Sequence, residues 1–248
     1  MSFKVVIVIP ARYASQRLPA KPLLKETGKY LIQHVYEAAS KSQKAQEVIV
    51  ATDDPRIYDA VLSFGGRVEM TSEHHKSGTD RMAEVAKKVK ADIYVNVQGD
   101  EPEISPIAID DLISKLASQN QASVATLVYP LDPELAHNPN IVKVVCDQSG
   151  HALYFSRARI PYPREGNGEN FLGHIGMYAY YQNFLFIYPD LPPSKLERIE
   201  KLEQLRVLES GYKIITAITS YRSQGIDTRE DYDAFVRRYN AMQKLSCD

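Results

Sequence analysis

The sequence contains little cysteine and almost no net charge. Its two cysteines, Cys146 and Cys247, lie in an apolar run and near the last residue, which argues against a disulfide framework and predicts a reducing, cytoplasmic environment. Its 30 lysine and arginine residues are balanced by 31 aspartate and glutamate residues. No overall field therefore attracts nucleic acid or an anionic membrane, and an anionic ligand must be bound by a local site.

Long apolar runs and several familiar motifs are also missing. The first apolar stretch, residues 5–9, ends at Pro10; it is too short for a signal peptide or a membrane span, and we interpret it as a buried strand. Neither GxxxxGKS/T nor GxGxxG occurs, which disfavours a Walker ATPase and a NAD-dependent oxidoreductase. The six histidines show no HxH or HExxH spacing, so a zinc site has no support.

The first half of the chain has the rhythm of an α/β protein. Residues 79–90 carry apolar side chains at i, i+3, i+4 and i+7, which predicts a helix that packs on a sheet. Such crossover helices are almost always right-handed, so we expect a doubly wound, mostly parallel sheet within a single domain spanning residues 1–248. The strands of this sheet are expected in β-branched runs at residues 5–9, 48–52, 67–71, 92–97 and 123–128.

The second half changes character. Strand-like runs follow one another there without a long helix between them, which predicts an antiparallel extension over residues 130–185. Residues 193–209 are expected to form one helix, with its apolar positions facing the core and Gly211 closing it. The other expected elements are strands at 141–145, 152–155, 176–181 and 212–218, a mobile loop at 164–170 and a last helix after Asp227.

The strongest chemical signal is the loop PARYASQRLPAKPL, residues 10–23. It directly follows the first strand, at the edge of a doubly wound sheet where ligands bind. Arg12, Arg17 and Lys21 place three cations within ten residues of this loop. Arginine grips phosphate oxygens in a bidentate manner, and lysine adds a point charge. The loop is therefore suited to a polyphosphate, although a solvated basic loop is the simpler alternative.

This loop resembles the nucleotide-binding signature of sugar nucleotidyltransferases. Its RYxSxRLPxKPL form is similar to that of the 3-deoxy-manno-octulosonate (Kdo) cytidylyltransferases, with Ala20 where that family usually has glycine. The resemblance implies a Mg²⁺-dependent enzyme that transfers CMP from CTP to Kdo for lipopolysaccharide synthesis, releases pyrophosphate, and forms a homodimer through residues 130–185. Further blocks that fit the family are ATDD at 51–54, SGTDR at 77–81, VNVQGDEP at 95–102, NPNIVKVV at 138–145, YFSRARIP at 154–161, HIGMYAY at 174–180, ERIEKLEQLR at 197–206 and GIDTREDYD at 225–233.

Two carboxylates are candidates for a metal site. Asp100 follows an apolar strand and is expected near the phosphate loop, where a carboxylate beside a triphosphate requires a cation such as Mg²⁺. It could instead cap the following helix. Asp227 has the same alternative, with Glu230 as its capping-box partner, unless Thr228 caps the helix and leaves Asp227 available. The resemblance implies that Asp100 and Asp227 are metal ligands and that they are catalytic together with Lys21.

The block SGTDR is the candidate site for the base and ribose. Ser77, Gly78 and Arg81 offer polar contacts that could separate cytosine from uracil, since cytosine has a donor amine where uracil has an acceptor. For the hydroxyls a helix start capped by Ser77 or Thr79 is equally supported. The resemblance favours nucleotide binding for Arg81 and adds Ala11 to the nucleotide site.

The second half is expected to bind the sugar acid. A hydroxylated carboxylate needs a cation for its acid group and mixed donors and acceptors for its hydroxyls. His174 alone would more often be a structural histidine, and Glu203 with Arg206 an ordinary helix pair. The residues that the resemblance implies for substrate binding are Gln98, Arg157, His174, Tyr178, Glu203 and Gln204.

The expected reaction is in-line attack by the anomeric hydroxyl of Kdo on the α-phosphate of CTP. Such transfer depends on positioning and charge neutralisation, and the sequence identifies no general base. The alternatives are the same reaction on 8-amino-Kdo or a sialic acid, and a catalytically silent nucleotide-binding module on this fold.

Overall fold

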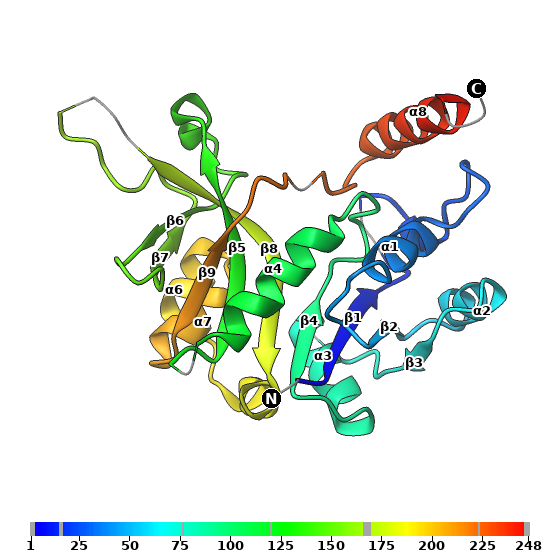
Figure 1. The fold of residues 1–248 in the computed structure, drawn as a ribbon, viewed down its shortest axis with the longest axis horizontal. Coiled ribbons are helices and arrows are strands. Elements are labelled where there is room, and N and C mark those ends of the chain that lie inside the picture. Colours follow the sequence, from blue (N-terminus) through cyan, green and yellow to red (C-terminus); the bar gives the residue numbers. More distant parts are fainter. Residues whose placement is uncertain are drawn as a thin grey trace.

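The computed structural model describes residues 3–14, 17–75, 77–119, 121–165, 170–222 and 224–245. These residues form a mixed sheet covered by helices, with the strand order β3-β2-β1-β4-β8-β5-β9 (Figure 1). Cys247 and most of the predicted mobile loop lie outside the described residues. No helix of the described chain is long and apolar enough to cross a membrane.

The first four strands form the predicted parallel half of the sheet. The pairs β1 with β2, β1 with β4, and β2 with β3 are all parallel. Their bounds are β1 Val5–Ala11, β2 Glu47–Thr52, β3 Val68–Met70 and β4 Ile93–Asn96. Successive side chains of a strand point to opposite faces. In β1, Ile7 and Ile9 accordingly enter one core while Val6 and Val8 enter the other, as a sheet buried on both faces requires.

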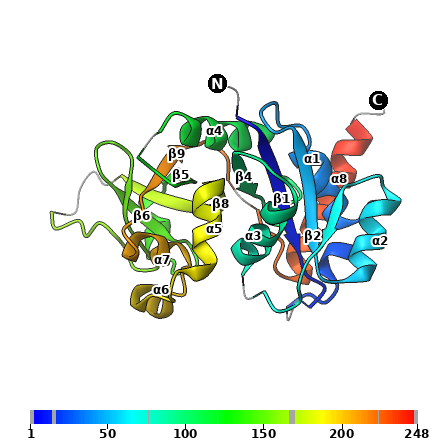
Figure 2. The same cartoon turned by 90° about the horizontal axis from the view of Figure 1, so that it is seen from below.

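Helices cover both faces of this sheet (Figure 2). One core contains side chains of α1 (Leu31–Ala39), α2 (Pro55–Ser63) and α4 (Pro106–Ala117). The opposite core contains side chains of α3 (Gly78–Lys88), α5 (Gln182–Ile187) and α7 (Gln204–Glu209). The last helix, α8 (Arg229–Leu245), packs through Tyr232 and Phe235 against Leu18 of the basic loop and Leu31 of α1. The predicted doubly wound α/β fold is confirmed.

The antiparallel segment is only partly an extension. Strands β6 (Lys143–Cys146) and β7 (Ala152–Ser156) pair with each other beside the main sheet. Strand β8 (Phe171–Tyr181) instead runs through the middle of the sheet, antiparallel to both β4 and β5 (Val124–Leu131). Strand β5 pairs on its other side with β9 (Ile214–Ile218), in parallel. A strand from the second half therefore separates β4 from β5.

The single helix predicted over residues 193–209 is wrong. The chain forms α6 (Lys195–Glu200) and α7, separated by Lys201 in the left-handed conformation with φ 56° and ψ 47°. Leu202 and Leu205 are buried as expected, but Ile199 is 67% exposed because the break turns α6 away from the core. Gly211, with φ +81°, follows α7 and donates its N–H to the Leu208 carbonyl, as predicted for a helix end. Three short 3₁₀ helices complete the described chain: Lys21–Leu23, Pro133–His137 and Tyr188–Asp190.

Candidate active site

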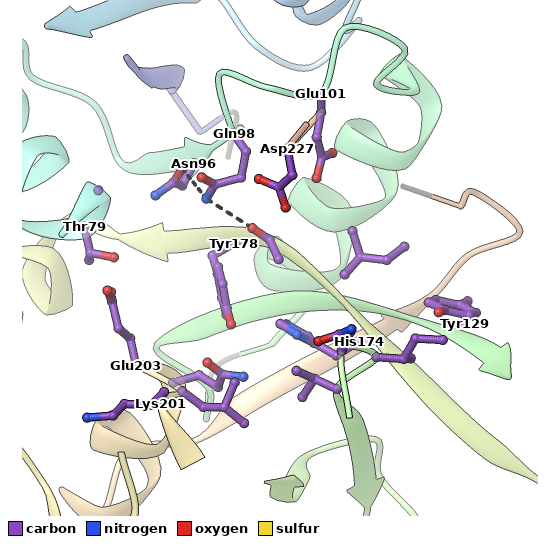
Figure 3. A pocket seen from close by; sticks show the side chains of 18 of the residues that line it. Thr79, Asn96, Gln98, Glu101, Tyr129, His174, Tyr178, Lys201, Glu203 and Asp227 are labelled. Atoms are coloured by element: carbon purple, nitrogen blue, oxygen red, sulfur yellow. Dashed lines mark hydrogen bonds between the residues drawn. The ribbon is translucent and has the colours of Figure 1, made fainter. Parts of the chain in front are cut away.

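A cavity of about 600 Å³ opens where β4 and β8 meet the segment between α6 and α7 (Figure 3). Its volume is that of a small-molecule site. The predicted site residues that line it are Gly78, Gln98, His174, Tyr178, Glu203, Gln204 and Asp227. It is also lined by residues that the sequence had not indicated as site residues, including Thr79, Asn96, Glu101, Tyr129, Asn140, Gly176, Lys201 and Arg222.

The basic loop and the two candidate metal ligands meet beside this cavity. The Lys21 ammonium lies 2.6 Å from Asp100 Oδ2 and 3.7 Å from Asp227 Oδ1, and donates to the Ile226 carbonyl at 2.7 Å. Arg17 pairs with Asp227 at 2.9 Å. A backbone hydrogen bond from Ile226 N to Asp100 O, 2.9 Å long, holds the two segments together. Charges more than 200 residues apart in sequence thus form one cluster, as the sheet-edge argument predicts.

Neither aspartate caps a helix. Ser105 caps α4 by accepting the Ala108 N–H at 3.3 Å, which leaves Asp100 out of the cap. At the start of α8 the hydroxyl of Thr228 accepts the Asp231 N–H, and the Asp231 carboxylate accepts the Thr228 N–H at 2.9 Å. Asp231 is therefore the capping-box partner and the prediction of Glu230 is wrong. The carboxylates of Asp100 and Asp227 are left to bind cations.

The carboxylates of Asp100 and Asp227 could hold a divalent cation whose remaining ligands are oxygens of a bound substrate and water. A single cation, the Lys21 ammonium, already contacts both carboxylates. Among the described residues no group of three or more His, Cys, Asp or Glu side chains converges on one point. Mg²⁺ commonly takes one or two carboxylates together with phosphate oxygens and water. Asp100 and Asp227 are consistent with that pattern.

At the start of α3, the capping residue has a structural role and the next two residues are accessible from the cavity. The Ser77 hydroxyl accepts the Asp80 N–H at 3.0 Å, and the Asp80 carboxylate accepts the Ser77 N–H at 3.2 Å, so Ser77 is the helix cap. Gly78 and Thr79 face the cavity. The sequence left open whether the hydroxyls of this block cap the helix or contact a ligand. In the structure Ser77 caps α3, and Gly78 and Thr79 line the cavity.

Arg81 does not lie at the cavity surface. Its side chain is fully buried, and its guanidinium pairs with Asp53 at 2.6 Å and donates to the Thr71 hydroxyl. Direct contact with a nucleotide, which the resemblance favoured, would require this buried pair to break. Elsewhere in the predicted nucleotide site, Ala11 is buried at the end of β1, and Arg12 donates to the His75 carbonyl at 2.6 Å.

Arg157, which the resemblance implied for substrate binding, makes its described side-chain contacts with the backbone. Its guanidinium donates to the carbonyls of Glu200, at 2.9 Å, and Pro139, at 3.0 Å, and it does not line the cavity. These bonds support the two cavity walls that carry Asn140 and Lys201. Within the described chain, the cations that line the cavity are Lys201 and Arg222, neither of which the sequence had singled out. The left-handed Lys201 was undetectable because its conformation follows from tertiary packing.

On the β8 side of the cavity, burial keeps His174 and Tyr178 uncharged, although Lys201, Glu203 and Arg222 also line the cavity. Burial lowers the pKa of His174 to about 3, so its imidazole is neutral at physiological pH. Burial also raises the pKa of the Tyr178 hydroxyl far above its usual value. Partial desolvation, with a smaller contribution from the Asp80 carboxylate, raises the pKa of Glu203. Figure 3 shows the Glu203 carboxylate directed toward Thr79.

The His174 ring has a defined protonation pattern. The Thr126 hydroxyl lies 3.0 Å from His174 Nε2 and 2.9 Å from the Met177 carbonyl. The hydroxyl also lies 3.2 Å from the Ile175 carbonyl. Carbonyls can only accept, so we assign the hydroxyl proton to these carbonyls and the Nε2–H of His174 as the donor to Thr126. His174 Nδ1 is then a hydrogen-bond acceptor.

Fold and site together define an α/β nucleotidyltransferase: a basic loop after β1 faces two carboxylates at the sheet edge, beside a polar cavity. Residues 6–214 match the family model described as Cytidylyltransferase. The 3-deoxy-manno-octulosonate cytidylyltransferase of Geobacter metallireducens is 47% identical over 254 residues, covering 97% of this chain and 99% of the relative. That of Escherichia coli is 49% identical over 225 residues, covering 91% and 92%.

A solved structure is similar over the same length. It is that of a CMP:2-keto-3-deoxy-manno-octonic acid synthetase complexed with CTP, with a TM-score of 0.91, 46% identity, and coverage of 98% of this chain and 99% of that one. The chain therefore belongs to the cytidylyltransferase family and, within it, to the 3-deoxy-manno-octulosonate cytidylyltransferases.

Proposed function

We propose that this chain transfers CMP from CTP to Kdo, releasing pyrophosphate and activating the sugar for lipopolysaccharide synthesis. The observation that carries the proposal is the position of Asp227, which belongs both to the cluster with Lys21 and Arg17 and to the lining of the cavity. A residue shared by a phosphate-binding cluster and a sugar-sized cavity is what joining a nucleotide to a sugar requires. Relatives named for this activity, and a similar structure with bound CTP, support the assignment.

The basic loop is proposed to bind the triphosphate. Arg17 and Lys21 are paired with carboxylates, and phosphate oxygens compete for the same donors. The Arg17 side chain is 67% exposed, so its exchange from Asp227 to a phosphate costs little. Arg12 lies beside the loop that precedes α3 and is proposed to bind the same ligand from that side. Ala11, Ser77 and Gly78 are proposed to provide the wall for the base and ribose.

Mg²⁺ is proposed to be held by Asp100 and Asp227, with phosphate oxygens as further ligands. When bound, it would supply charge neutralisation for the phosphates and acidify a nearby hydroxyl. Lys21 must leave the two carboxylates for this to occur, and the phosphates offer its ammonium a new partner. Lys21 is therefore proposed as a catalytic residue that moves between carboxylate and phosphate.

The cavity is proposed to orient the sugar acid through hydrogen bonds. Neutral His174 accepts from a sugar hydroxyl at Nδ1, Glu203 accepts from another, and the carboxamides of Gln98 and Gln204 both donate and accept. Tyr178, whose pKa is raised, contributes a protonated hydroxyl. Arg157 is proposed to act on substrate through the walls it supports. In-line attack of the anomeric hydroxyl then depends on this positioning, with no side chain assigned as general base.

The test of this proposal is pyrophosphate release with CTP and Mg²⁺ against three acids: Kdo, its 8-amino analogue and a sialic acid. Release with Kdo, at a kcat/KM well above that of the other two, is the expected result. Preference for either of the others would transfer the same reaction to that acid. No release with any of them, at retained CTP binding, would favour a silent nucleotide-binding module.

A homodimer through residues 130–185, in the cytoplasm, is part of the same proposal. Large apolar side chains exposed in this segment support it: Leu135 is 48% exposed, Leu153 61% and Tyr162 83%. Sedimentation at working concentration is expected to give twice the chain mass, and a stable monomer would remove the dimer. The unpaired thiol of Cys146 agrees with a reducing compartment.

A further inference from the structure

Strand β8 turns one face toward the cavity. Its residues alternate between buried and partly exposed positions, and His174, Gly176 and Tyr178 share the face that lines the cavity. Gly176 therefore lies between the two aromatic side chains of the site. Its carbonyl accepts a hydrogen bond of 3.4 Å from Gln98 Nε2, drawn as a dashed line in Figure 3.

Gly176 also lies in a bulge. The pairing of β5 with β8 jumps from Thr126 opposite Tyr178 to Leu127 opposite Ile175, which leaves Gly176 and Met177 without partners on β5. The Thr126 hydroxyl satisfies the Met177 carbonyl at this irregularity. Bulges often re-aim side chains beside active sites, and a glycine within a strand often marks the close approach of a ligand.

Neither backbone conformation nor packing requires glycine at this position. Gly176 has no left-handed φ, and a Cβ built on it would meet no atom within 4 Å. Gly173, on the same strand, is the contrast: a Cβ there would lie 2.7 Å from Tyr129 Cε1, so the packing of Tyr129 demands glycine. A strand glycine without a packing partner loses more conformational entropy on folding than alanine would. Its advantage must lie in the space that it leaves.

We propose that Gly176 is a specificity-determining residue, whose missing side chain opens the floor of the cavity so that the ring of the sugar acid lies directly on the β8 backbone. The ring would lie beside the His174 and Tyr178 rings, which contact each other with centroids 5.5 Å apart, and would be reached by the Gln98 carboxamide. A pyranose ring carrying hydroxyls matches this setting, because its flat apolar face can contact the backbone while its edges meet polar groups. The inference rests on the proposed function. It identifies the space above Gly176 as the feature that selects among sugar acids by the size and position of their ring.

The test is a graded series, Gly176→Ala and Gly176→Val, with Gly173→Ala as the matched control on the same strand. Gly176→Ala should raise the KM for the sugar acid about 10- to 200-fold, the discrimination that one methyl group gives in a fitted pocket. Gly176→Val should raise it further. The KM for CTP should stay within about twofold, and the melting temperature should stay equal or rise. Gly173→Ala should lower the melting temperature because its methyl group meets the Tyr129 ring.

Each outcome decides the matter. An unchanged KM for the sugar acid in Gly176→Ala overturns the inference, while pyrophosphate release by the wild type still upholds the proposed function. A lower melting temperature with equal losses toward CTP and sugar acid assigns Gly176 a structural role and also overturns it. Wild-type protein that releases no pyrophosphate with any acid overturns the proposed function and this inference with it.

Discussion

The basic loop and the cavity face of β8 handle charge in opposite ways. In the loop region, Arg17 and Lys21 pair with Asp227 and Asp100, while Arg12 donates to the His75 carbonyl. On β8, burial keeps His174 neutral and Tyr178 protonated. The first region must exchange partners when a ligand arrives, whereas the second presents fixed hydrogen-bonding groups. Nucleotide binding is therefore expected to be sensitive to salt and metal, and sugar binding to shape.

The largest expected effect comes from Asp227→Asn in the charged region. Turnover should fall by about a thousandfold, which is about 4 kcal/mol of barrier, because Asp227 faces both the loop cations and the cavity. Folding should survive, since Thr228 and Asp231 cap α8 without it. CTP affinity should fall much less, because Arg12 and Lys21 remain. Initial rates at saturating Mg²⁺, calorimetry with CTP and thermal unfolding measure the three quantities.

The matched control is Asp233→Asn, on the same helix. Asp233 pairs with Arg229 on the surface, at 2.9 Å, and its loss should leave both turnover and melting temperature nearly unchanged. Near-normal turnover in Asp227→Asn would contradict the metal assignment. A large loss of stability would instead return Asp227 to a structural role.

The second largest effect is expected from Lys21→Met, which tests whether the Lys21 ammonium exchanges its carboxylate partners for phosphate. Removing the ammonium leaves Asp100 and Asp227 without their shared cation, so the affinity for Mn²⁺ in the absence of CTP should rise about tenfold. Turnover should nevertheless fall about 100-fold, because the phosphates lose a charge partner. Paramagnetic resonance of free Mn²⁺ measures the first quantity, and Lys25→Met, two residues beyond the loop, is the control. Equal Mn²⁺ affinity in wild type and variant would show that Lys21 does not compete with the metal.

Local sequence predicted the parallel half of the fold well. Strands β1, β2 and β4 are short runs rich in β-branched residues, and helix α3 carries a 3.6-residue period, so their structure is encoded within each segment. The place of β8 between β4 and β5 could not be predicted, because strand order depends on contacts between segments 40 to 88 residues apart. The break at Lys201 was hidden for the same reason: the apolar period continues through it.

The residues of the candidate site show the same difference between what local sequence predicts and what depends on tertiary contacts. Lys21 and Asp100 were expected at one edge of the sheet because each follows a strand of its parallel half, which local pattern reveals. The metal-binding role of Asp100 and Asp227 came from the family resemblance and remains a prediction. The positions of Arg81 and Arg157 were not, because a long guanidinium side chain takes its partner from tertiary structure: Asp53 for one, the Glu200 carbonyl for the other. Gly176 gave no signal, since a glycine in a strand pattern does not reveal which side of it is empty.

A moderate effect is expected from Arg81→Met. This variant tests whether Arg81 stabilises the fold through its pair with Asp53 or contacts the nucleotide directly. The variant leaves Asp53, 18% exposed, without its cation, and stability should fall by about 3 kcal/mol. Adding Asp53→Asn should recover part of that loss. CTP affinity, measured well below the melting temperature, should change little. A strong loss of CTP affinity at unchanged stability would place Arg81 in direct contact with the nucleotide.

The smallest expected effect concerns the neutral face of β8 and the pH dependence of stability. The pKa of His174 is lowered from 6.5 to about 3, so below pH 6.5 the unfolded chain binds a proton there that the folded chain does not. Stability must therefore fall as the pH drops from 6.5 toward 3, and at pH 5.5 His174 should account for about 1 kcal/mol of that loss relative to pH 8. His34, whose pKa is lowered to about 4 chiefly by burial, makes a second such contribution.

His174→Gln keeps a donor for Thr126 but cannot titrate, so its unfolding free energy should fall less between pH 8 and 5.5 than that of the wild type. Urea unfolding at the two pH values measures this difference. Equal falls in both proteins would mean that His174 takes up a proton in the folded state as readily as in the unfolded chain, and the contrast between the charged loop and the uncharged groups on β8 would then fail at His174.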